Sequence, residues 1–340
     1  MSTIGTSQTT LKPSTVIEDL EICFKLKQQL LIVGPPAIGK TDCVKQAAQR
    51  AGMQCIISHP SIDDPTDAKG FPFPAQDGNS AKFLPYGKLK KILDSGEPTV
   101  WLLDDLGQAS ESVQKSYMQP LRGRLMGDHY VPDHVVFCAA TNDVKQMSGV
   151  MGLLEPIKSR FHSIIFMEAD LNDWCKWAEE NDMPAVLIAF LRTNPKLLSN
   201  FKPTRDFTNC PSPREWEAVG KRWNEKVYRQ HLDEGSVGKG AAIEAYAFLE
   251  LAQKAPSIDA MLMDPKNSEV PEEPSIRYLV AGGIARRMTK SNMKAALEYL
   301  YRMPQPFRVM SLLDATRRDK ALTKTAAFCS WASKEGADLI

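Results

Sequence analysis

A glycine-rich segment near the start of the chain combines residue types and a spacing that suit phosphate binding. Gly34-Pro35-Pro36-Ala37-Ile38-Gly39-Lys40-Thr41 matches the pattern G-x-x-x-x-G-K-[ST]. Glycines let backbone N–H groups curl around phosphate oxygens, and a helix that begins there adds the positive end of its dipole. We expect Lys40 to reach the β- and γ-phosphates and the Thr41 hydroxyl to bind Mg²⁺. The predicted cofactors are therefore ATP and Mg²⁺.

Two adjacent carboxylates form a second chemical feature. Asp104 and Asp105 end the apolar run Val100-Trp101-Leu102-Leu103. In a parallel sheet the carboxyl end of such a strand lies beside the phosphate loop. Asp104 would hold Mg²⁺, directly or through water, and Asp105 would position or activate the attacking water. The alternative interpretation is an acidic turn after a buried strand.

These residues need a sheet to position them, and the pattern of the first half of the chain predicts one. Short apolar runs alternate with helical stretches, which indicates a parallel α/β sheet. The predicted strands are 29–33, 54–58, 99–103, 134–140 and 163–166. The predicted helices are 15–27, opened by a capping box from Thr15 to Glu18, then 40–51, 88–95 and 109–119. Residues 60–87, rich in Pro, Gly and Asp, are expected to form a loop.

The strand pattern stops after Ala169, and the rest of the chain is predicted to be helical. One helix should run from Pro213 to about His231 and another over 241–253. We expect four segments: an α/β nucleotide-binding domain over 1–169, a helical lid over 170–255, a polar, proline-rich linker over 256–274 and a helical extension over 275–340.

Composition narrows the class of protein. The chain has 340 residues and a formal net charge of +1, which does not favour a polyanion partner by bulk charge. Its seven cysteines include no CxxC pair, so a zinc finger is not expected, and their odd number fits a reducing compartment. No signal peptide or run of 18 apolar residues is present, so we expect no membrane span and a cytoplasmic protein.

The phosphate loop, the acidic strand end and later residues resemble the MoxR branch of AAA+ ATPases, which includes the CbbQ and NorQ-type activators. The resemblance covers roughly residues 15–255. It implies a P-loop NTPase core of the AAA+ type with a five-stranded parallel sheet and a helical lid. It also implies a hexameric ring that hydrolyses ATP to ADP and phosphate, acts as a chaperone on a protein client and works with a von Willebrand factor A-domain protein. Some members are encoded by viruses, so a bacterial cell or a virus-infected host cytoplasm is the expected location.

The same resemblance assigns roles to three later residues. Asn142, at the end of Ala139-Ala-Thr-Asn, matches the sensor that hydrogen-bonds the attacking water or γ-phosphate. Arg160, in Leu154-Glu-Pro-Ile-Lys-Ser-Arg-Phe, matches the arginine finger that reaches a neighbouring subunit, with Lys158 as the second choice. Arg214 follows Ser212-Pro213 and matches the lid sensor. The alternatives are an Asn that caps a turn and arginines on ordinary surfaces.

One departure from the family concerns the second carboxylate. AAA+ motors mostly carry Glu at that position, whereas this chain has Asp105, which is one methylene shorter. Hydrolysis would then be slower, or the protein would act as an ATP-binding switch with little turnover. A nucleic-acid machine, either a helicase loader or a DNA translocase, is a further and less favoured alternative that would use the same site.

Two segments are candidates for delivering work. Residues 61–87 carry Phe71, Phe73, Phe83 and Tyr86, which would either grip a client or pin a long loop to the core. Residues 122–129 contain a Gly-rich turn that resembles the hairpin that such proteins place before the Asn sensor. Its arginines would contact nucleic acid, an acidic client or a neighbouring subunit. The client's identity does not follow from the sequence.

Overall fold

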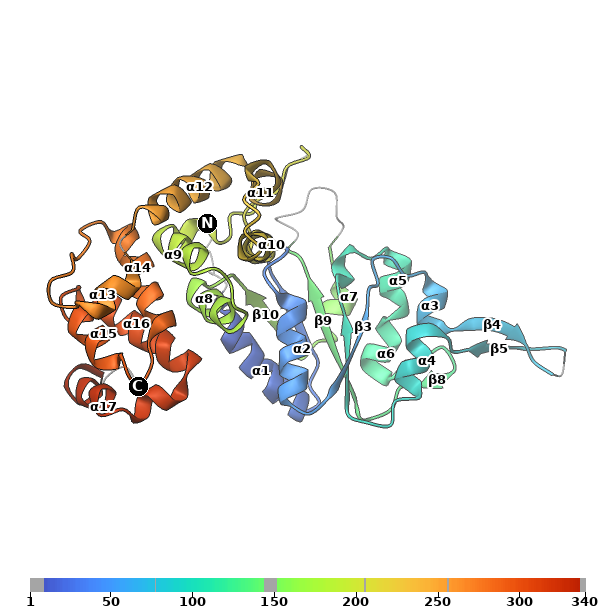
Figure 1. The fold of residues 1–340 in the computed structure, drawn as a ribbon. Coiled ribbons are helices and arrows are strands. Elements are labelled where there is room, and N and C mark those ends of the chain that lie inside the picture. Colours follow the sequence, from blue (N-terminus) through green and yellow to red (C-terminus); the bar gives the residue numbers. More distant parts are fainter. Residues whose placement is uncertain (1–8, 77, 144–151, 205, 256, 337–340) are drawn as a thin grey trace, which may run out of the picture. The chain divides into compact units, whose positions relative to one another are not determined.

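A computed structural model of the chain describes residues 9–76, 78–143, 152–204, 206–255 and 257–336 (Figure 1). Its contacts divide the chain into two units. Unit 1 is Met1–Asp170 with Phe201–Arg205, and unit 2 is Leu171–Asn200 with Asp206–Ile340.

A six-stranded sheet forms the centre of unit 1, and all of its neighbouring strands are parallel. In spatial order the strands are β1 (Thr10–Leu11), β10 (Ser163–Met167), β2 (Leu30–Val33), β9 (Val135–Thr141), β6 (Thr99–Leu103) and β3 (Gln54–Ser58). The predicted α/β fold with a parallel sheet is therefore confirmed. The sheet has six strands rather than five, because β1 is a two-residue strand too short to leave a hydrophobic pattern.

Helices cover both faces of this sheet, which explains why every residue of its central strands β6 and β9 is buried (Figure 1). On one face Leu102 packs with residues of α1 (Pro13–Lys25) and α2 (Lys40–Arg50). On the other face Trp101 packs with residues of α4 (Gly87–Leu93), α5 (Glu111–Ser116) and α6 (Met118–Gly123). Successive residues of β6 thus enter different cores, as the twofold repeat of a strand requires.

Two helix predictions in unit 1 were wrong, one in its start and one in its continuity. Helix α1 begins at Pro13 with Lys12 as its N-cap and no side-chain cap, so the capping box predicted at Thr15 does not form. Proline is well suited to the first helical position because its missing N–H has no partner there. The helix predicted over 109–119 is instead two short helices, α5 and α6, which meet at Tyr117.

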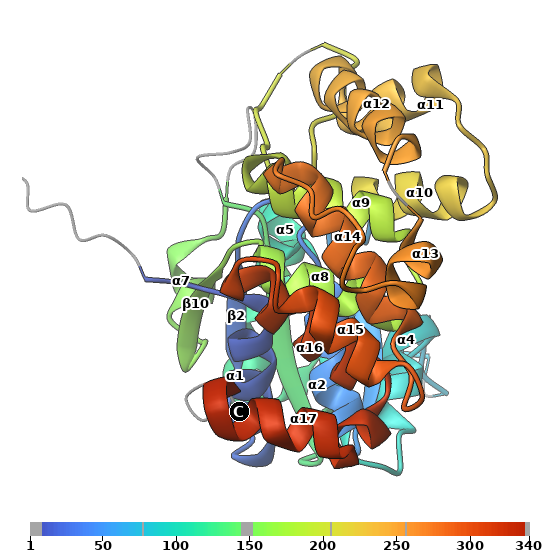
Figure 2. The same cartoon turned by 60° about the vertical axis from the view of Figure 1, so that its left-hand side comes forward.

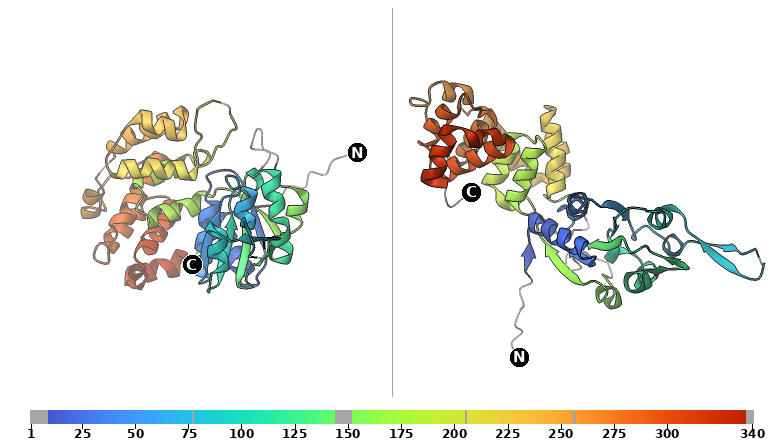
Figure 3. Two further views of the ribbon diagram at one scale, coloured as in Figure 1. Left: turned by 90° about the vertical axis from the view of Figure 1, so that its right-hand side faces the viewer. Right: turned by 90° about the horizontal axis from the view of Figure 1, so that it is seen from below.

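The loop predicted over 60–87 was also wrong, because this segment contains regular structure. It forms α3 (Pro65–Lys69) and an antiparallel hairpin of β4 (Phe71–Pro74) and β5 (Ala81–Leu84), which extends away from the sheet (Figure 3). Asp64 and Asp67 form a reciprocal capping box at the start of α3. Gly70 then turns the chain at φ +96°, where a Cβ would lie 2.7 Å from the Leu84 carbonyl oxygen.

Every regular element in the described part of unit 2 is helical. The helices are α8 (Leu171–Glu180), α9 (Ala185–Thr193), α10 (Pro213–Asn224), α11 (Gln230–Val237), α12 (Lys239–Gln253), α13 (Ile258–Met263), α14 (Pro274–Arg287), α15 (Met293–Leu300), α16 (Gln305–Arg318) and α17 (Ala326–Trp331), with short 3₁₀ and π turns between or after them. The helix predicted from Pro213 to about His231 ends at Asn224, and a second one begins at Gln230. The segment predicted as a linker contains α13.

The C-terminal helices of unit 2 surround their own apolar core (Figure 2). Ile284, Tyr299, Leu312 and Trp331 are all buried there, and each comes from a different helix. Helix α14 packs against both α16 and α9, so it links the extension to the first helices of the unit. Among the described residues, no helix combines the length and apolarity needed to cross a membrane.

Candidate nucleotide-binding site

The predicted phosphate loop connects β2 to α2, in the strand-to-helix context that its pattern requires. Gly39 is the N-cap of α2 at φ +95°, a conformation that favours glycine, and Ala37 also has a positive φ of 61°. A Cβ at position 34 would lie 2.4 Å from the Met167 carbonyl oxygen. The loop therefore needs glycine at position 39 because of the backbone conformation and at position 34 because a side chain would not fit.

Lys40 is buried at the base of this loop. Its Nζ donates hydrogen bonds to the carbonyl oxygens of Gly34 at 2.9 Å and Pro35 at 2.6 Å, and to Asn142 Oδ1 at 2.7 Å. Asn142 follows β9, which pairs directly with β2. The ammonium group thus lies over the loop and within reach of the neighbouring strand, where a phosphate cradled by the loop would meet it.

Thr41 and Asp104 are also brought together, from α2 and the end of β6. The Thr41 hydroxyl donates a hydrogen bond to Asp104 Oδ2 at 2.8 Å. A hydroxyl and a carboxylate are oxygen donors of the kind that Mg²⁺ prefers, and the ion usually keeps waters and phosphate oxygens as its other ligands. No group of three or more His, Cys, Asp or Glu side chains among the described residues is arranged to hold a metal. These two residues fit a magnesium that arrives with a nucleotide.

Asp105 and Asn142 form the third part of the arrangement. Asn142 Nδ2 donates to Asp105 Oδ1 over 3.4 Å, and Gln108 Nε2 donates to the same oxygen at 3.0 Å. Strand β9 lies between β2 and β6, so the Asn142 amide bridges Lys40 on one side and Asp105 on the other. Five predicted site residues are thereby linked through hydrogen bonds in pairs or chains, namely Lys40, Thr41, Asp104, Asp105 and Asn142.

Sequence reasoning missed two polar residues beside these carboxylates. His59 Nδ1 lies 4.0 Å from Asp104 Oδ2, and Gln108 holds Asp105 as described above. His59 follows β3, and the carboxyl ends of parallel strands meet at one edge of the sheet. Its position after a predicted strand was therefore a usable signal.

Arg160 is placed differently from these five residues. Its Nε donates to the Met118 carbonyl oxygen at 2.6 Å, and its guanidinium also donates to the Pro156 carbonyl oxygen. These contacts hold the side chain against α6 and α7 (Glu155–Lys158). Lys158, the second choice for the finger, forms an i,i+3 ion pair with Glu155 at 2.6 Å.

Arg214 belongs to unit 2 and is exposed at the second position of α10. The Ser212 hydroxyl caps this helix by accepting from the Glu215 N–H at 3.3 Å, and Pro213 occupies the first helical position. The small residue, proline and arginine of the predicted lid sensor therefore do form a helix start.

The β4–β5 hairpin exposes the aromatic residues that the sequence singled out. Phe71 is paired with Leu84 and Phe73 with Lys82, which puts these four side chains on one face. Phe71, Phe73 and Leu84 are 58%, 56% and 49% exposed. The alternative that the aromatics pin a loop to the core is therefore wrong for Phe71 and Phe73.

A second hairpin of β7 (Leu125–Met126) and β8 (His129–Tyr130) precedes β9, where the resemblance placed one. Its Asp128 accepts from the Phe83 N–H at 3.4 Å, and His129 Nε2 lies 2.7 Å from the Phe83 carbonyl oxygen. Arg124 donates to the carbonyl oxygens of Val131 and Val135 at 3.0 and 2.8 Å. Arg124 therefore has a structural role in holding this turn.

Burial makes the thiols of two cysteines harder to ionise. Burial raises the pKa of Cys55 to about 11 and that of Cys175 to about 12. Because the thiolate is the reactive form, these thiols are inert at neutral pH.

No family model matches the chain, and no curated protein matches it in sequence. Solved structures with a similar arrangement include the Thermotoga maritima RuvB Holliday junction branch migration motor, at 13% identity over 85% of this chain and 87% of that chain, with a TM-score of 0.42. NtrX from Brucella abortus in complex with ADP has 12% identity over 95% and 68%, with a TM-score of 0.44. A second structure of B. abortus NtrX has 13% identity over 94% and 69%, with a TM-score of 0.42. At these low scores, the assignment of the site rests on the geometry of this chain itself.

Proposed function

We propose that this chain is an AAA+ ATPase of the MoxR type, which hydrolyses Mg·ATP in an oligomeric ring and uses the energy to remodel a protein client. One observation carries the ATPase assignment. A phosphate loop, a hydroxyl–carboxylate pair, a second carboxylate and an amide meet at the carboxyl edge of one parallel sheet. This is the edge at which open α/β sheets bind ligands.

Each residue has a role that follows from its position. The N–H groups of the loop and Lys40 bind the phosphates, and Thr41 and Asp104 would hold a magnesium ion, which would supply positive charge to neutralise the phosphates. Asp105 accepts a hydrogen bond from the attacking water while Asn142 orients that water or a γ-phosphate oxygen. Water then bonds to the γ-phosphorus as the bond to the β–γ bridging oxygen breaks, and a proton of the water passes through Asp105 to the released phosphate, leaving ADP.

The ring assignment rests on Arg160 and on the resemblance to MoxR proteins. We assign Arg160 to the γ-phosphate of the neighbouring subunit, where its charge would stabilise the transition state. It must then exchange its hydrogen bonds to Met118 and Pro156, so we expect the finger to form only on assembly. Arg214 is assigned to the γ-phosphate of its own subunit, where it would couple the nucleotide state to the lid.

We assign the client contact to the exposed face of the β4–β5 hairpin. Phe71, Phe73 and Leu84 form an apolar patch on an element that extends from the sheet, and such patches mark protein contacts. The assignment of a von Willebrand factor A-domain partner follows from the resemblance alone.

Steady-state ATPase assays with Mg²⁺ test the central assignment. Wild type should turn over ATP, whereas Lys40→Ala should lose at least about a hundredfold in kcat/KM, because phosphate binding and charge stabilisation are both removed. Lys45→Ala is the matched control, since Lys45 lies on the same helix and pairs with Asp42 at the surface. Equal rates for wild type and Lys40→Ala would refute the ATPase. Binding of ATP without single-turnover hydrolysis would instead establish the switch.

A mixing experiment tests the ring. Lys40→Ala retains Arg160, and Arg160→Ala retains the phosphate loop, so a mixture should regain activity at interfaces that combine the two intact halves. Lys158→Ala, mixed in the same way, tests the second choice for the finger. A mixture as inactive as its components would exclude shared sites.

DNA-stimulated hydrolysis with a steep salt dependence would support the nucleic-acid machine instead.

A further inference from the structure

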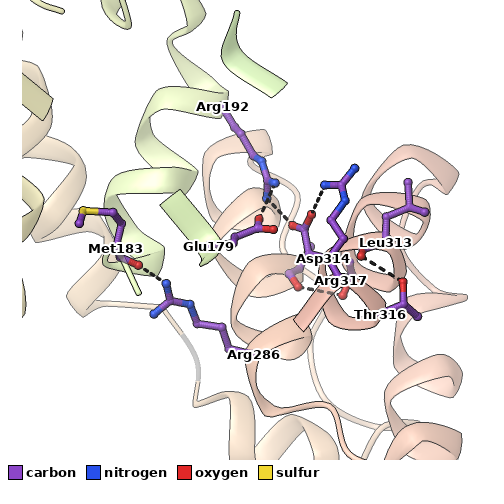
Figure 4. Close-up of polar contacts among 10 residues, drawn as sticks. Glu179, Met183, Arg192, Arg286, Leu313, Asp314, Thr316 and Arg317 are labelled. Carbon is purple, nitrogen blue, oxygen red and sulfur yellow. Dashed lines mark hydrogen bonds and ion pairs between the residues drawn. The ribbon is translucent and has the colours of Figure 1, made fainter. Parts of the chain in front are cut away.

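Two carboxyl groups in unit 2 share one guanidinium where α8, α9 and α16 meet (Figure 4). Arg192 donates to Glu179 Oε1 at 2.9 Å and to Asp314 Oδ2 at 2.7 Å. The three side chains are largely buried, with exposures of 18% for Glu179, 11% for Arg192 and 6% for Asp314. The cluster therefore connects the first two helices of the unit to a helix more than a hundred residues away in the sequence.

The charges in this cluster do not balance if both acids are ionised. Two buried carboxylates against one buried guanidinium leave an excess negative charge. Arg317 reaches Asp314 Oδ1 only at 3.4 Å, and its side chain is 42% exposed, so solvent screens that pair. In addition, Glu179 Oε2 is buried and has no hydrogen-bond partner among the described residues. A buried carboxylate oxygen without a donor is destabilising.

We propose that Glu179 carries a proton at neutral pH and that its Oε2 donates this proton in a hydrogen bond to Asp314, so that the three residues form a proton-dependent joint between α8–α9 and α16. The proton resolves both problems at once. The cluster becomes neutral, and the unsatisfied oxygen becomes a donor. Loss of the proton would place two adjacent carboxylates in a buried site and weaken the attachment of α16. This inference is independent of the proposed ATPase.

The electrostatic surroundings agree with this geometry. Burial and then the Asp314 carboxylate raise the pKa of Glu179 to about 8, against the smaller opposing effect of Arg192. A cavity of about 260 Å³ has Glu179, Arg192 and Asp314 among its lining residues. The other titratable or charged groups around Glu179 are Cys175, Lys176, Glu180 and Asp182 near its own helix, Arg286 on α14, and Arg317 and Arg318 on α16.

The direction of the pH effect follows from linkage. The ordinary pKa of Glu179 is 4.5, so between about pH 4.5 and pH 8 the folded chain holds one proton that the unfolded chain has released. The folding equilibrium constant should therefore fall about tenfold per pH unit across this window because of Glu179. Above the folded pKa this group has no further effect.

Urea unfolding of the full chain from pH 5 to pH 9 tests the proposal, with tryptophan fluorescence as the signal. Glu179→Gln mimics the protonated acid, because its amide can accept from Arg192 and donate to Asp314. The tenfold change in the folding equilibrium constant per pH unit that is due to Glu179 should therefore be absent from this variant. Glu180→Gln, an exposed neighbour on the same helix, should leave the wild-type slope unchanged. An unchanged slope in Glu179→Gln would overturn the proposal.

Direct titration covers the case in which a variant does not fold. In the full wild-type chain, with ¹³C-labelled glutamate carboxyls, one resonance should titrate near pH 8. A set in which every glutamate titrates near its ordinary pKa would refute the proton on Glu179. Amide exchange in α16, corrected for its intrinsic pH dependence, should speed up as that resonance titrates. Exchange that does not change through this range would refute the joint.

Discussion

The two units use similar polar groups in opposite ways. At the edge of the sheet in unit 1, Lys40 at the start of α2 is connected to Asp105 through the Asn142 side chain, and Asp104 accepts a hydrogen bond from Thr41. In unit 2, Glu179 and Asp314 converge on one guanidinium. In the proposed nucleotide site, the Lys40 ammonium group lies against the backbone of the phosphate loop, which suits a cluster that binds a ligand. In unit 2 the charged groups of Glu179, Arg192 and Asp314 face one another, which suits a cluster that holds helices together.

The largest expected effect in unit 1 comes from the second carboxylate. Asp105→Asn should lower single-turnover hydrolysis by about 10²–10⁴-fold, because an amide is a poor acceptor for the proton of the attacking water. ATP binding and the unfolding midpoint should stay close to wild type. Quench-flow and nucleotide titration measure the two properties separately. A variant that hydrolyses ATP at the wild-type rate would remove Asp105 from the mechanism.

In unit 2 the matching change is Arg192→Met, which leaves two buried carboxyl groups without their cation. We expect the free energy of unfolding to fall by about 3–5 kcal/mol at neutral pH. Tryptophan fluorescence suits this measurement, because Trp174, Trp177, Trp216, Trp223 and Trp331 belong to unit 2 and only Trp101 to unit 1. A loss below about 1 kcal/mol, typical of an exposed ion pair, would show that the cluster does not hold the helices together.

Substitutions of Asn142, whose amide bridges Lys40 and Asp105, should have smaller effects on activity. Asn142→Ala removes the link between Lys40 and Asp105, and we expect kcat to fall about tenfold to a hundredfold with little change in KM. Asn142→Asp has nearly the same shape but adds a negative charge beside the γ-phosphate, so its loss should be at least as large. If Asn142→Ala raised KM alone, the amide would serve binding rather than the chemical step.

The smallest effect on stability is expected at the hairpin. Phe71→Ser with Phe73→Ser should change the free energy of unfolding by less than about 0.5 kcal/mol per site, because both side chains are exposed. Basal ATPase should be unchanged, while stimulation by the client should be lost. Lys82→Ser, on the same face, is the control for a change of surface without loss of apolar area. Normal client stimulation in the double variant would move the contact surface elsewhere.

The sequence predicted those parts of the molecule that depend on local patterns. Strands β3 and β6 were placed correctly because short runs of consecutive apolar residues, rich in β-formers, favour a buried strand. Asp104 and Asn142 were expected at one edge because parallel strands share the direction of their ends. The structure places both there, whereas the roles of these residues remain predictions until the variants are measured.

What the sequence did not predict depends on contacts between distant segments or on unusual strand composition. Nothing local indicates that Arg192 would meet Asp314, 122 residues further along the chain. The β4–β5 hairpin was missed because Pro72 and Pro74 normally argue against a strand. His59 was missed because no motif includes it, although its place after β3 puts it beside Asp104.

The two prolines of β4 have a consequence for how the hairpin meets other chains. The Ala75 N–H donates to the Ser80 carbonyl oxygen, so the N–H groups of odd-numbered residues in β4 face β5. The backbone nitrogens on the outer edge of β4 are those of Pro72 and Pro74, which have no N–H to donate. On the outer edge of β5, the backbone groups of Phe83 are occupied by Asp128 and His129. Strand addition, the usual route from an exposed hairpin to aggregation, is therefore disfavoured on both edges. The hairpin presents its phenylalanines to partners through side chains alone.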